Sequence, residues 1–472
     1  MTQNVTELSG RFHWFERWGH LAVMFLLVFA FVTGGGSRDR GIGDVLTQLL
    51  ALPLVLWAVL SLCASTGRGS WLGRGAVGGS LLIIGTMAIQ QLPLPEALWR
   101  SIGVREALAR DLQAAGVDGL RHIWSLSPLD SERGLWSVMP ALAVFLGALA
   151  LPVQQHRRML LLVVFLSTVS LVLGFLQLGA PQDSALNPFP EWAPSLNGFF
   201  SSPNHQATAL AISMVMIAAL LLYDWRDVEA QQMPRGWRYA LTALGAILLA
   251  SLPLAGSRAM LLLAVLGLVA VPMILRRGRR YPTTSVPRAR AILVLLGIFA
   301  AGVGLAAAAW LRFDAAEEVR WSATKATAAM GWAHAPFGAG LGAFVPWFDQ
   351  TAPEDLIQGK YFNHAHNEYA QWWLESGLLG VASVLGTIVL LVLCYPRRPV
   401  ATSEGDRGVA VAAWLGCVLM LLHSWVDYPL RTPALMSVAG LLAGIVVAQR
   451  VALGSATAYA KNSLTAQASE PA

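Results

Sequence analysis

Long apolar segments recur along almost the whole chain and constrain its fold more than any other feature. Crossing a bilayer takes a helix of roughly 20 predominantly apolar residues, and by that length rule we expect about twelve such helices. Only 13% of the residues are charged, about half the share of about 25% that is usual in a soluble domain. The sequence therefore predicts an all-α, polytopic integral membrane protein. The expected spans are 19–33, 45–63, 75–92, 135–152, 159–179, 203–223, 239–256, 259–275, 291–310, 369–394, 408–422 and 433–449.

The positions of the basic residues predict the orientation of these spans. Arginine runs lie in short loops, around 156–158, 276–280 and 397–398, and short loops rich in Lys and Arg stay in the cytoplasm. We therefore expect both termini inside, with a cytoplasmic lead at 1–18 and a small, polar, disordered tail at 454–472. The net charge of +6 then reflects membrane topology, and it gives no reason to expect a nucleic-acid partner.

Several outer loops follow from this topology, and the longest of them is 311–368. Loops 93–133 and 180–202 lie among the first nine spans, which occupy 19–310, and apolar positions in the first of them recur at helical spacing, which predicts an amphipathic helix on the membrane surface. The loop 311–368 precedes the last three spans, which occupy 369–453. A structureless loop of that length is uncommon unless it is functional, so we expect it to carry the catalytic residues. Closely spaced turn-forming residues predict a defined turn in it, namely Pro336, Gly338, Gly340 and Gly342.

Two histidines stand where this loop meets the tenth span. His364 and His366 are two residues apart and have no third ligand of suitable spacing nearby, so they make a weak metal pair. One histidine acting as a general base is the stronger interpretation, because an imidazole with a pKa of about 6.5 can activate a hydroxyl near neutrality. The alternative is a hydrogen-bonded histidine that only caps the helix.

An arginine at the outer start of the eighth span is the second candidate. Ser257 can cap that helix, which places Arg258 in its first turn. Backbone N–H groups and a guanidinium at one place make an anion site, although Arg258 could also only reach toward lipid phosphates. Within the spans, Glu375 and His205 are the exceptions to a nearly complete lack of ionisable residues. A coupled transporter needs such charges in the membrane, so the sequence favours chemistry at the outer surface.

Several motifs resemble the O-antigen ligase/polymerase superfamily, which includes WaaL-type ligases and Wzy-type polymerases. His366-Asn367, nine residues and then Gly377-x-x-Gly380 match the H-[NSQ]-x9-G-x-x-G signature of that superfamily. The resemblance covers roughly residues 120–450. It extends to Ser-Leu-Ser-Pro at 125–128, Gly198-Phe199-x4-Asn204-His205, Ser257-Arg258, Arg320-Trp321 and the Pro-Phe-Gly-Ala-Gly-Leu-Gly-Ala-Phe stretch at 336–344.

The resemblance implies a helical membrane fold of the GT-C type and a glycosyltransferase whose donor is a glycan on undecaprenyl pyrophosphate. It implies that His366 is the general base and that Arg258 and Arg320 bind the pyrophosphate leaving group. Guanidinium groups can stabilise that leaving group, so we expect neither a metal nor another cofactor, and in-line attack would invert the anomeric centre. Further candidates for binding substrate are Asn204, His364 and Asn367, with Asp427 and Arg431 either completing the site or, as we favour, pairing with each other.

The stretch from His423 to Pro433 resembles polymerases of exopolysaccharide systems. We therefore expect a polymerase of lipid-linked repeat units, with an O-antigen ligase acting on lipid A core as the alternative. A related family that glycosylates proteins, a polysaccharide transporter and a structural subunit of an export complex stay open. The resemblance places the protein in a bacterial inner membrane with a periplasmic active site. Membrane lipids, a glycan or lipid-linked acceptor, a flippase and a chain-length regulator are the expected partners.

Overall fold

The computed structural model of the chain is helical throughout the parts that it describes, which are residues 2–37, 41–64, 71–117, 121–192, 195–226, 234–276, 315–357, 361–396 and 406–468. These parts contain no β-strand, only an isolated bridge between Pro93 and Ile123. The all-α prediction is confirmed. The helices are α1 (Thr2–Thr33), α2 (Ile42–Ala64), α3 (Trp71–Ile89), α4 (Glu96–Arg100), α5 (Arg105–Ala114), α6 (Pro128–Ser137), α7 (Met139–Ala150), α8 (His156–Leu178), α9 (Pro203–Arg226), α10 (Arg235–Ser251), α11 (Arg258–Arg276), α13 (Ala315–Ala333), α14 (Phe344–Thr351), α15 (Glu354–Ile357), α16 (Glu368–Leu393), α17 (Arg407–His423) and α18 (Pro433–Ala468), with short 3-10 turns η1 (Val153–Gln155), η2 (Pro190–Trp192), η3 (Leu252–Ala255) and η4 (Pro429–Arg431).

Eleven of the expected spans coincide with helices of the structure. Among the described residues, eight helices are long and apolar enough to cross a membrane, and three shorter apolar helices accompany them. The expected span at 291–310 lies outside the described residues, so the count of about twelve stays a prediction. The long ones are Ile42–Cys63, Pro128–Ala150, Val153–Leu178, Pro203–Tyr223, Gly236–Ala255, Arg258–Leu275, Glu368–Leu393 and Pro433–Ala452, and the shorter ones are Trp18–Thr33, Val77–Ile89 and Arg407–His423.

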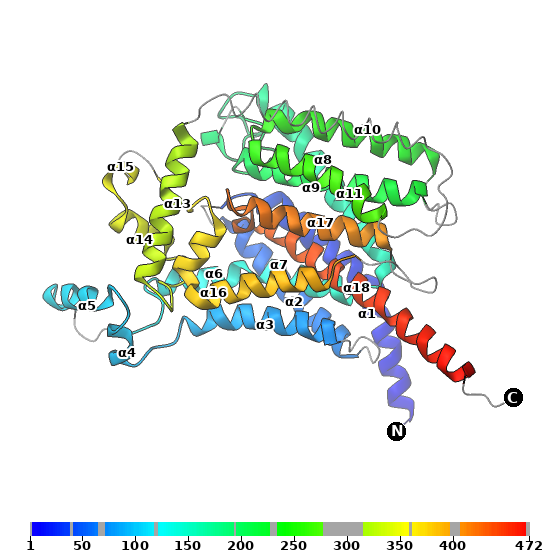
Figure 1. Cartoon of the computed structure of the whole chain (residues 1–472), viewed down its shortest axis with the longest axis horizontal. Helices are drawn as coiled ribbons and strands as arrows, with labels where there is room; N and C mark the ends of the chain where they lie inside the picture. Colours follow the sequence, from blue (N-terminus) through cyan, green and yellow to red (C-terminus); the bar gives the residue numbers. More distant parts are fainter. Residues whose placement is uncertain are drawn as a thin grey trace.

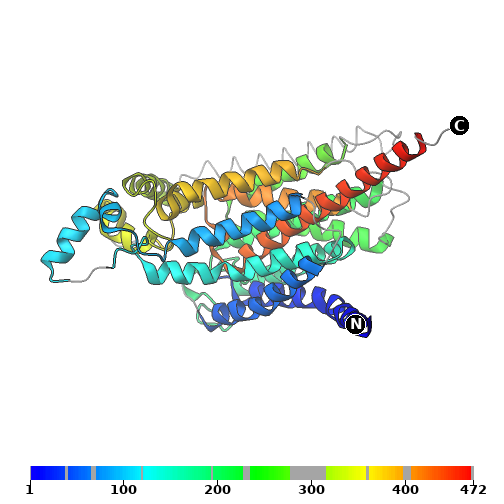
Figure 2. The ribbon, with the colours of Figure 1, turned by 90° about the horizontal axis from the view of Figure 1, so that it is seen from below.

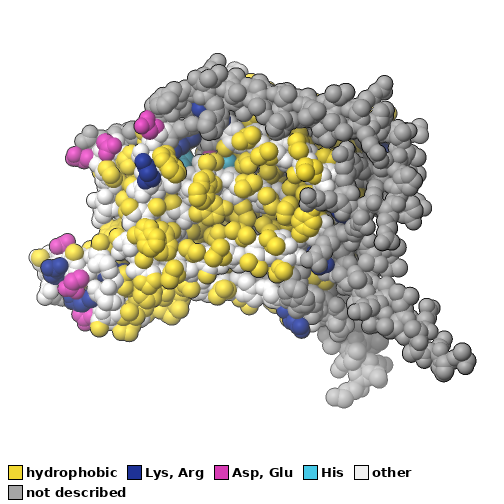
Figure 3. Space-filling view, in the orientation of Figure 1, with side chains coloured by type: hydrophobic (Ala, Val, Ile, Leu, Met, Phe, Trp, Pro, Cys, Tyr) yellow, Lys and Arg dark blue, Asp and Glu magenta, His cyan; other side chains and the backbone are white. Residues whose placement is uncertain are grey.

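The long helices run side by side in one bundle with two different ends (Figure 1, Figure 2). Both chain termini lie at one end, as the predicted topology requires, and α4, α5 and α13 to α15 gather at the other. Apolar side chains cover the described flank, while charged side chains collect around α4 and α5 (Figure 3). An apolar flank between two polar ends is the surface that a bilayer requires. That the end with α13 to α15 faces the periplasm stays a prediction.

Close helix contacts in the centre depend on small residues. Gly440 and Gly444 of α18 face α7, where an added Cβ would lie 2.3 Å from the Ala141 carbonyl oxygen and 2.5 Å from that of Phe145. Helices in membranes approach closely at such positions because packing, rather than water exclusion, drives their association. This contact sets α18, and the loop that precedes it, firmly against the bundle.

Two segments differ from the sequence expectation. The loop 93–133 forms two helices, α4 and α5, rather than one, because Gly103 between them has φ +43° and a Cβ there would lie 1.8 Å from the Ala333 carbonyl oxygen. The tail that we expected to be disordered from 454 is helical to Ala468 as the end of α18. Its many alanines explain this, since alanine has the highest helix propensity.

Candidate functional site

The start of α16 is fixed by a side-chain cap directly after the two histidines. Asn367 accepts a hydrogen bond from the Ala370 N–H (2.9 Å) with its side-chain oxygen and donates to the Trp425 carbonyl (2.8 Å) with its nitrogen. The helix cap is therefore Asn367, and neither histidine is needed for it. A substrate-binding role for Asn367 stays a prediction, and both polar atoms of its side chain already have partners within the protein.

His366 stands in a backbone conformation that few residues adopt. Its φ is +53°, and it is the only non-glycine residue with positive φ in the described part of the chain. Such left-handed conformations cost free energy outside glycine and concentrate at functional sites, where the surrounding structure holds them. The turn directs the imidazole away from the helix cap and toward the loop that follows α17.

The imidazole of His366 meets a buried carboxylate from that loop. Its Nδ1 lies 3.5 Å from Oδ1 of Asp427, whose side chain is only 2% exposed. Burial alone would raise the pKa of Asp427, but the contact with His366 and the nearby histidine charges outweigh it and hold that pKa well below its usual range. Asp427 is therefore a carboxylate that favours a proton on Nδ1 of His366. Within the described residues, Nδ1 of His366 makes no hydrogen bond of standard geometry and contacts Asp427 at ion-pair distance, and no hydrogen bond to Nε2 is present.

The buried ring of Tyr428 packs against three histidines. Its ring centre lies 5.1 Å from that of His205, 4.6 Å from that of His364 and 4.8 Å from that of His366. Burial and the charge of Asp427 raise the pKa of Tyr428, and the positive charge of Arg320 acts in the opposite direction. The phenol is therefore neutral, and its ring packs against the three imidazoles.

His364 is held on both sides of its ring. Nδ1 lies 3.2 Å from the amide nitrogen of Gln371, and Nε2 lies 3.3 Å from the carbonyl oxygen of Ser37. Burial, and then the charge of Arg431, lowers the pKa of His364 well below its usual value. A neutral imidazole that accepts from Gln371 and donates to Ser37 satisfies both contacts. His364 therefore joins the segment after α1, which contains Ser37, to α16, and neither of its ring nitrogens is free.

Arg431 binds two carboxylates of α16, which corrects our expectation of an Asp427–Arg431 pair. Its guanidinium lies 2.9 Å from Glu368 and 2.9 Å from Glu375, and Gln371 donates a further hydrogen bond to Glu375 (2.9 Å). Burial acts against the charge, but the two carboxylates raise the pKa of Arg431 above its usual value. Two acids about two helical turns apart suit the two arms of a guanidinium better than one acid does. Asp427 therefore contacts His366 rather than Arg431.

The first glycine of the sequence signature is a break in α16. Gly377 has φ +53° and ψ −138°, and a Cβ there would lie 2.1 Å from the Pro336 carbonyl oxygen. The predicted turn of the large loop fills this break, because Leu378 donates to Pro336 (2.9 Å) and Gly340 donates to the Glu375 carbonyl (3.0 Å). The turn is confirmed, and it fixes the part of α16 that carries Glu375.

Two further candidates lie at the starts of other helices. Ser257 accepts a hydrogen bond from the Met260 N–H (3.4 Å), so it caps α11 as predicted and Arg258 is the first, half-buried residue of that helix. The helix packs against α9 and α17, which carry His205 and His423. Asn204 lies in the first turn of α9, where its N–H donates to Ser202 (3.3 Å). The roles of Arg258 and Asn204 in binding stay predictions.

Sequence reasoning missed four residues of this site. Tyr428 was not singled out, Glu368 was noted only as a carboxylate beside the two histidines, and His205 and Glu375 were given no role in the site. His205 is fully buried beside Tyr428, and neither of its ring nitrogens has a hydrogen-bond partner in the described structure. Its position next to Asn204 in the motif was the available signal. No three His, Cys, Asp or Glu side chains of the described residues could share a metal ion, while the expected independence from metals stays a prediction.

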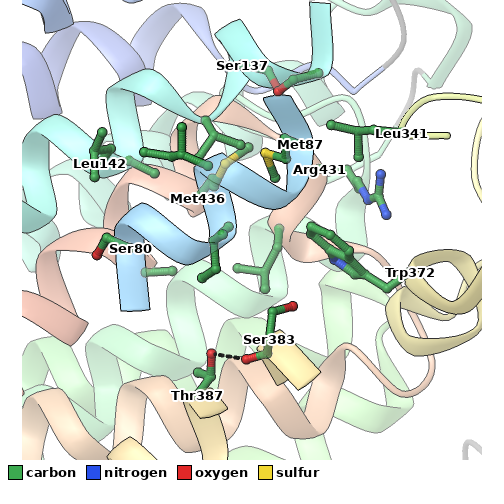
Figure 4. Close-up of a pocket in the computed structure, with 18 of the residues that line it drawn as sticks. Ser80, Met87, Ser137, Leu142, Leu341, Trp372, Ser383, Thr387, Arg431 and Met436 are labelled. Carbon is green, nitrogen blue, oxygen red and sulfur yellow. Dashed lines mark hydrogen bonds between the residues drawn. The ribbon is translucent and has the colours of Figure 1, made fainter. Parts of the chain in front are cut away.

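A long cavity opens beside this site, with a volume of about 1290 Å³. His364, Gln371, Glu375 and Arg431 line its polar end. Arg431 points into it next to Trp372 and Leu341 (Figure 4). Most of the remaining lining is apolar and comes from α3, α7, α16 and α18. The cavity therefore has one polar end and a long apolar part.

The fold and the site together define a polytopic membrane protein with a buried His–Asp pair at one end of its bundle. A family model described as O-antigen ligase matches residues 243–385, which include Arg258, Arg320, His366 and the break at Gly377. The match covers less than half of the chain and supports the resemblance to the O-antigen ligase/polymerase superfamily that its motifs predict. A comparison with curated proteins found no match. The family supports an enzyme of glycosyltransferase type that acts on lipid-linked glycans in a membrane.

Proposed function

We propose that this protein is an inverting, metal-independent glycosyltransferase that polymerises undecaprenyl-pyrophosphate-linked oligosaccharide repeat units at the periplasmic face of the inner membrane. The observation that carries the proposal is the contact between His366 and the buried carboxylate of Asp427 (3.5 Å). His366 lies within the residues 243–385 that the O-antigen ligase model matches. An imidazole oriented by a carboxylate is a general base with one free nitrogen.

The chemistry assigns one task to each of these groups. The acceptor hydroxyl attacks the anomeric carbon of the donor, and its proton passes to Nε2 of His366. The bond between the anomeric carbon and the pyrophosphate oxygen breaks, and its electron pair leaves with the pyrophosphate. Asp427 stabilises the imidazolium that forms, because the carboxylate is already ionised and lies against Nδ1. Attack opposite the leaving group inverts the anomeric centre.

The structure supports His366 over His364 as the base. Both ring nitrogens of His364 have partners, the Gln371 amide and the Ser37 carbonyl, and burial keeps its pKa low. His366 leaves Nε2 without a partner among the described residues. We therefore assign His364 to positioning and to binding at the edge of the site, together with Asn204.

Arg258 and Arg320 are the proposed ligands of the pyrophosphate. Arg320 acts electrostatically on Tyr428, and Tyr428 contacts the ring of His366, so its charge lies near the reacting atoms. Arg258 stands among the free N–H groups at the start of α11, where phosphates bind readily. Arg431 is less suited to this task because two carboxylates already neutralise it.

The alternative is an O-antigen ligase that transfers the lipid-linked glycan to lipid A core. The description of the matching family favours this alternative, and the resemblance of the stretch from His423 to Pro433 favours the polymerase. Transport is less favoured, since the buried acidic and basic residues of the described spans lie near helix ends rather than along a path across the bundle. They are His156, His205, Glu368, Glu375, Arg407 and His423. A flippase that delivers the donor and a chain-length regulator are the proposed partners.

Glycan transfer by the purified protein in detergent tests this proposal. The donor is a lipid-pyrophosphate oligosaccharide, and wild type is compared with Arg258→Ala, Arg320→Ala and the control His20→Ala, which lies in the middle of α1. We expect wild type and the control to build a ladder of longer lipid-linked glycans and both arginine variants to lose it. One addition to a lipid A core acceptor and no ladder would establish the ligase instead. Full activity of both arginine variants would refute the assigned site.

A further inference from the structure

The cavity beside the site is long enough to hold a lipid chain that crosses one leaflet of a bilayer and extends into the other. Along α16 its lining extends from Gln371 to Leu393, which at about 1.5 Å per residue is roughly 33 Å. The hydrocarbon core of a bilayer is also about 30 Å thick. Arg431 and His364 stand at one end, and Val447 of α18 lies toward the other. The cavity thus matches an amphiphile, with a polar head at the site and an apolar tail within the membrane.

The volume of the cavity indicates a single chain. At about 30 Å³ for each liquid-packed heavy atom, the value for water, the 1290 Å³ of the cavity hold roughly 40 heavy atoms. One long isoprenoid chain matches that number, whereas the several acyl chains of a lipid A exceed it. Small residues line part of the wall, among them Gly75, Gly79 and Gly386, and an added Cβ at each would meet no atom within 4 Å.

The cavity lies on a different side of the site from the proposed pyrophosphate ligands. Among the described residues, its lining comes from α2, α3, α6, α7, α14, α16, α17, α18 and the segments at 36–37, 341–342, 361–364 and 430–431, and none of it from α8 to α11 or α13. Arg258 begins α11, and Arg320 is part of α13. The ring of Tyr428 separates His364, which lines the cavity, from His366.

Transfer between two membrane-anchored molecules requires two lipid paths that meet at one base. We propose that the cavity holds the isoprenoid tail of the acceptor, while the donor binds through its pyrophosphate on the side of Arg258 and Arg320. This inference rests on the proposed function. The acceptor glycan then emerges beside His364 and Gln371 and reaches His366 past the edge of Tyr428. A single-chain acceptor is a lipid-linked glycan of the donor's own kind, as a polymerase uses.

A binding experiment tests the cavity without requiring any transferase activity. The probe is a polyprenyl phosphate with a diazirine on its terminal isoprene unit, crosslinked to the purified full chain in detergent and mapped by mass spectrometry. We expect labels on those halves of α3, α16 and α18 that lie away from Arg431 and His364. Labels confined to α8 to α11, or scattered over the whole lipid-facing surface, would overturn the proposal.

Substitutions that fill the cavity provide the matched comparison. Gly79→Phe and Gly386→Phe add a ring to open space in the cavity, whereas Gly85→Phe adds the same ring to an exposed position of α3 outside the lining. Phenylalanine is a better helix former than glycine, so folding is not at risk from the backbone. We expect both cavity variants to lose the mapped labels and Gly85→Phe to keep them. Equal labelling of all three would contradict the proposal.

Steady-state kinetics distinguish an acceptor cavity from a donor cavity. The donor is blocked at its own acceptor hydroxyl, and the acceptor is a prenyl glycan ether, which has no pyrophosphate and cannot donate. We expect Gly79→Phe to raise the acceptor KM about tenfold, since the ring displaces part of the chain from apolar contact, and to leave the donor KM unchanged. A rise in the donor KM alone would assign the cavity to the donor and overturn the inference. If the proposed function is wrong but the cavity still binds the lipid, the wild type will transfer no glycan while the probe still labels the cavity.

Discussion

Asp427 and His366 come from loops that are 61 positions apart in sequence, and the fold brings Oδ1 of one to 3.5 Å from Nδ1 of the other. Neither loop achieves this by itself. The left-handed turn at His366 aims the imidazole, and the backbone of Glu368 donates to the Ser424 carbonyl (2.9 Å), which joins the start of α16 to the end of α17.

Replacement of Asp427 tests the importance of this contact for the reaction. Asp427→Asn keeps the shape of the side chain but removes the charge that stabilises the imidazolium. We expect kcat to fall about a hundredfold, within the range usual for general acid–base groups, while donor binding is retained. Steady-state kinetics and donor binding by the same preparation measure this. An unchanged kcat would show that the contact is only structural.

The triad of Arg431, Glu368 and Glu375 gives a prediction about stability. Arg431→Met leaves two buried carboxylates without a positively charged partner, and breaking a buried pair in this way costs about 3–5 kcal/mol. The melting temperature in detergent should therefore fall strongly. The triple variant Arg431→Met, Glu368→Gln, Glu375→Gln removes all three charges and should recover most of that loss. If the single and triple variants melt at the same temperature, the charges are not what stabilises this region.

Two glycines of α16 should respond to alanine in opposite directions. Gly377→Ala places a Cβ 2.1 Å from the Pro336 carbonyl oxygen at φ +53°, and such strain alone costs about 1–3 kcal/mol. Gly386→Ala meets no atom within 4 Å and should stabilise the helix by about 1 kcal/mol. Thermal unfolding of the two variants checks both signs. Equal melting temperatures would contradict the break that the structure places at Gly377.

Because His334 is buried, we expect the protein to lose stability in mild acid. Burial, and then the charge of Arg105, lowers the pKa of His334 to about 4, and its ring accepts a hydrogen bond from the Trp347 indole. Between pH 6.5 and 4 the unfolded chain binds the proton that the folded protein excludes, so stability falls as pH decreases, by about 2 kcal/mol at pH 5 for this residue. His334→Gln keeps an acceptor but cannot titrate, so its melting temperature should depend less on pH between 7 and 5. An identical pH dependence would exclude this histidine as the cause.

The sequence predicted the helices well and their polar contacts poorly. Spans are encoded locally, because the length and apolar character of each run decide whether a helix can cross a bilayer. Caps are local as well, so Ser257 before α11 was foreseen. The partners of Asp427 and Arg431 depend on how the loop after α17 meets α16. That relationship depends on the packing of α18 against α7, whose Ala141 contacts Gly440 and lies 286 positions before Asp427 in the chain.

The site shows the same division between local and long-range information. The signature marked His366 and Gly377, and the structure explains both, as a left-handed turn and as a helix break filled by Pro336. The choice between His364 and His366 was open because it depends on Ser37 and Gln371, which occupy both nitrogens of His364. Tyr428 was missed because no spacing rule predicts which ring will lie among three histidines.

The transfer rate of His366→Ala tests the central claim most directly. Wild type and variant are purified in detergent, matched for melting temperature and for binding of a lipid-pyrophosphate oligosaccharide, and then compared for the growth of lipid-linked glycans with time. We predict that wild type extends the glycan and that His366→Ala binds the donor equally well but transfers it at least about a hundredfold more slowly. Extension by His366→Ala at the wild-type rate would contradict the assignment of His366 as the base.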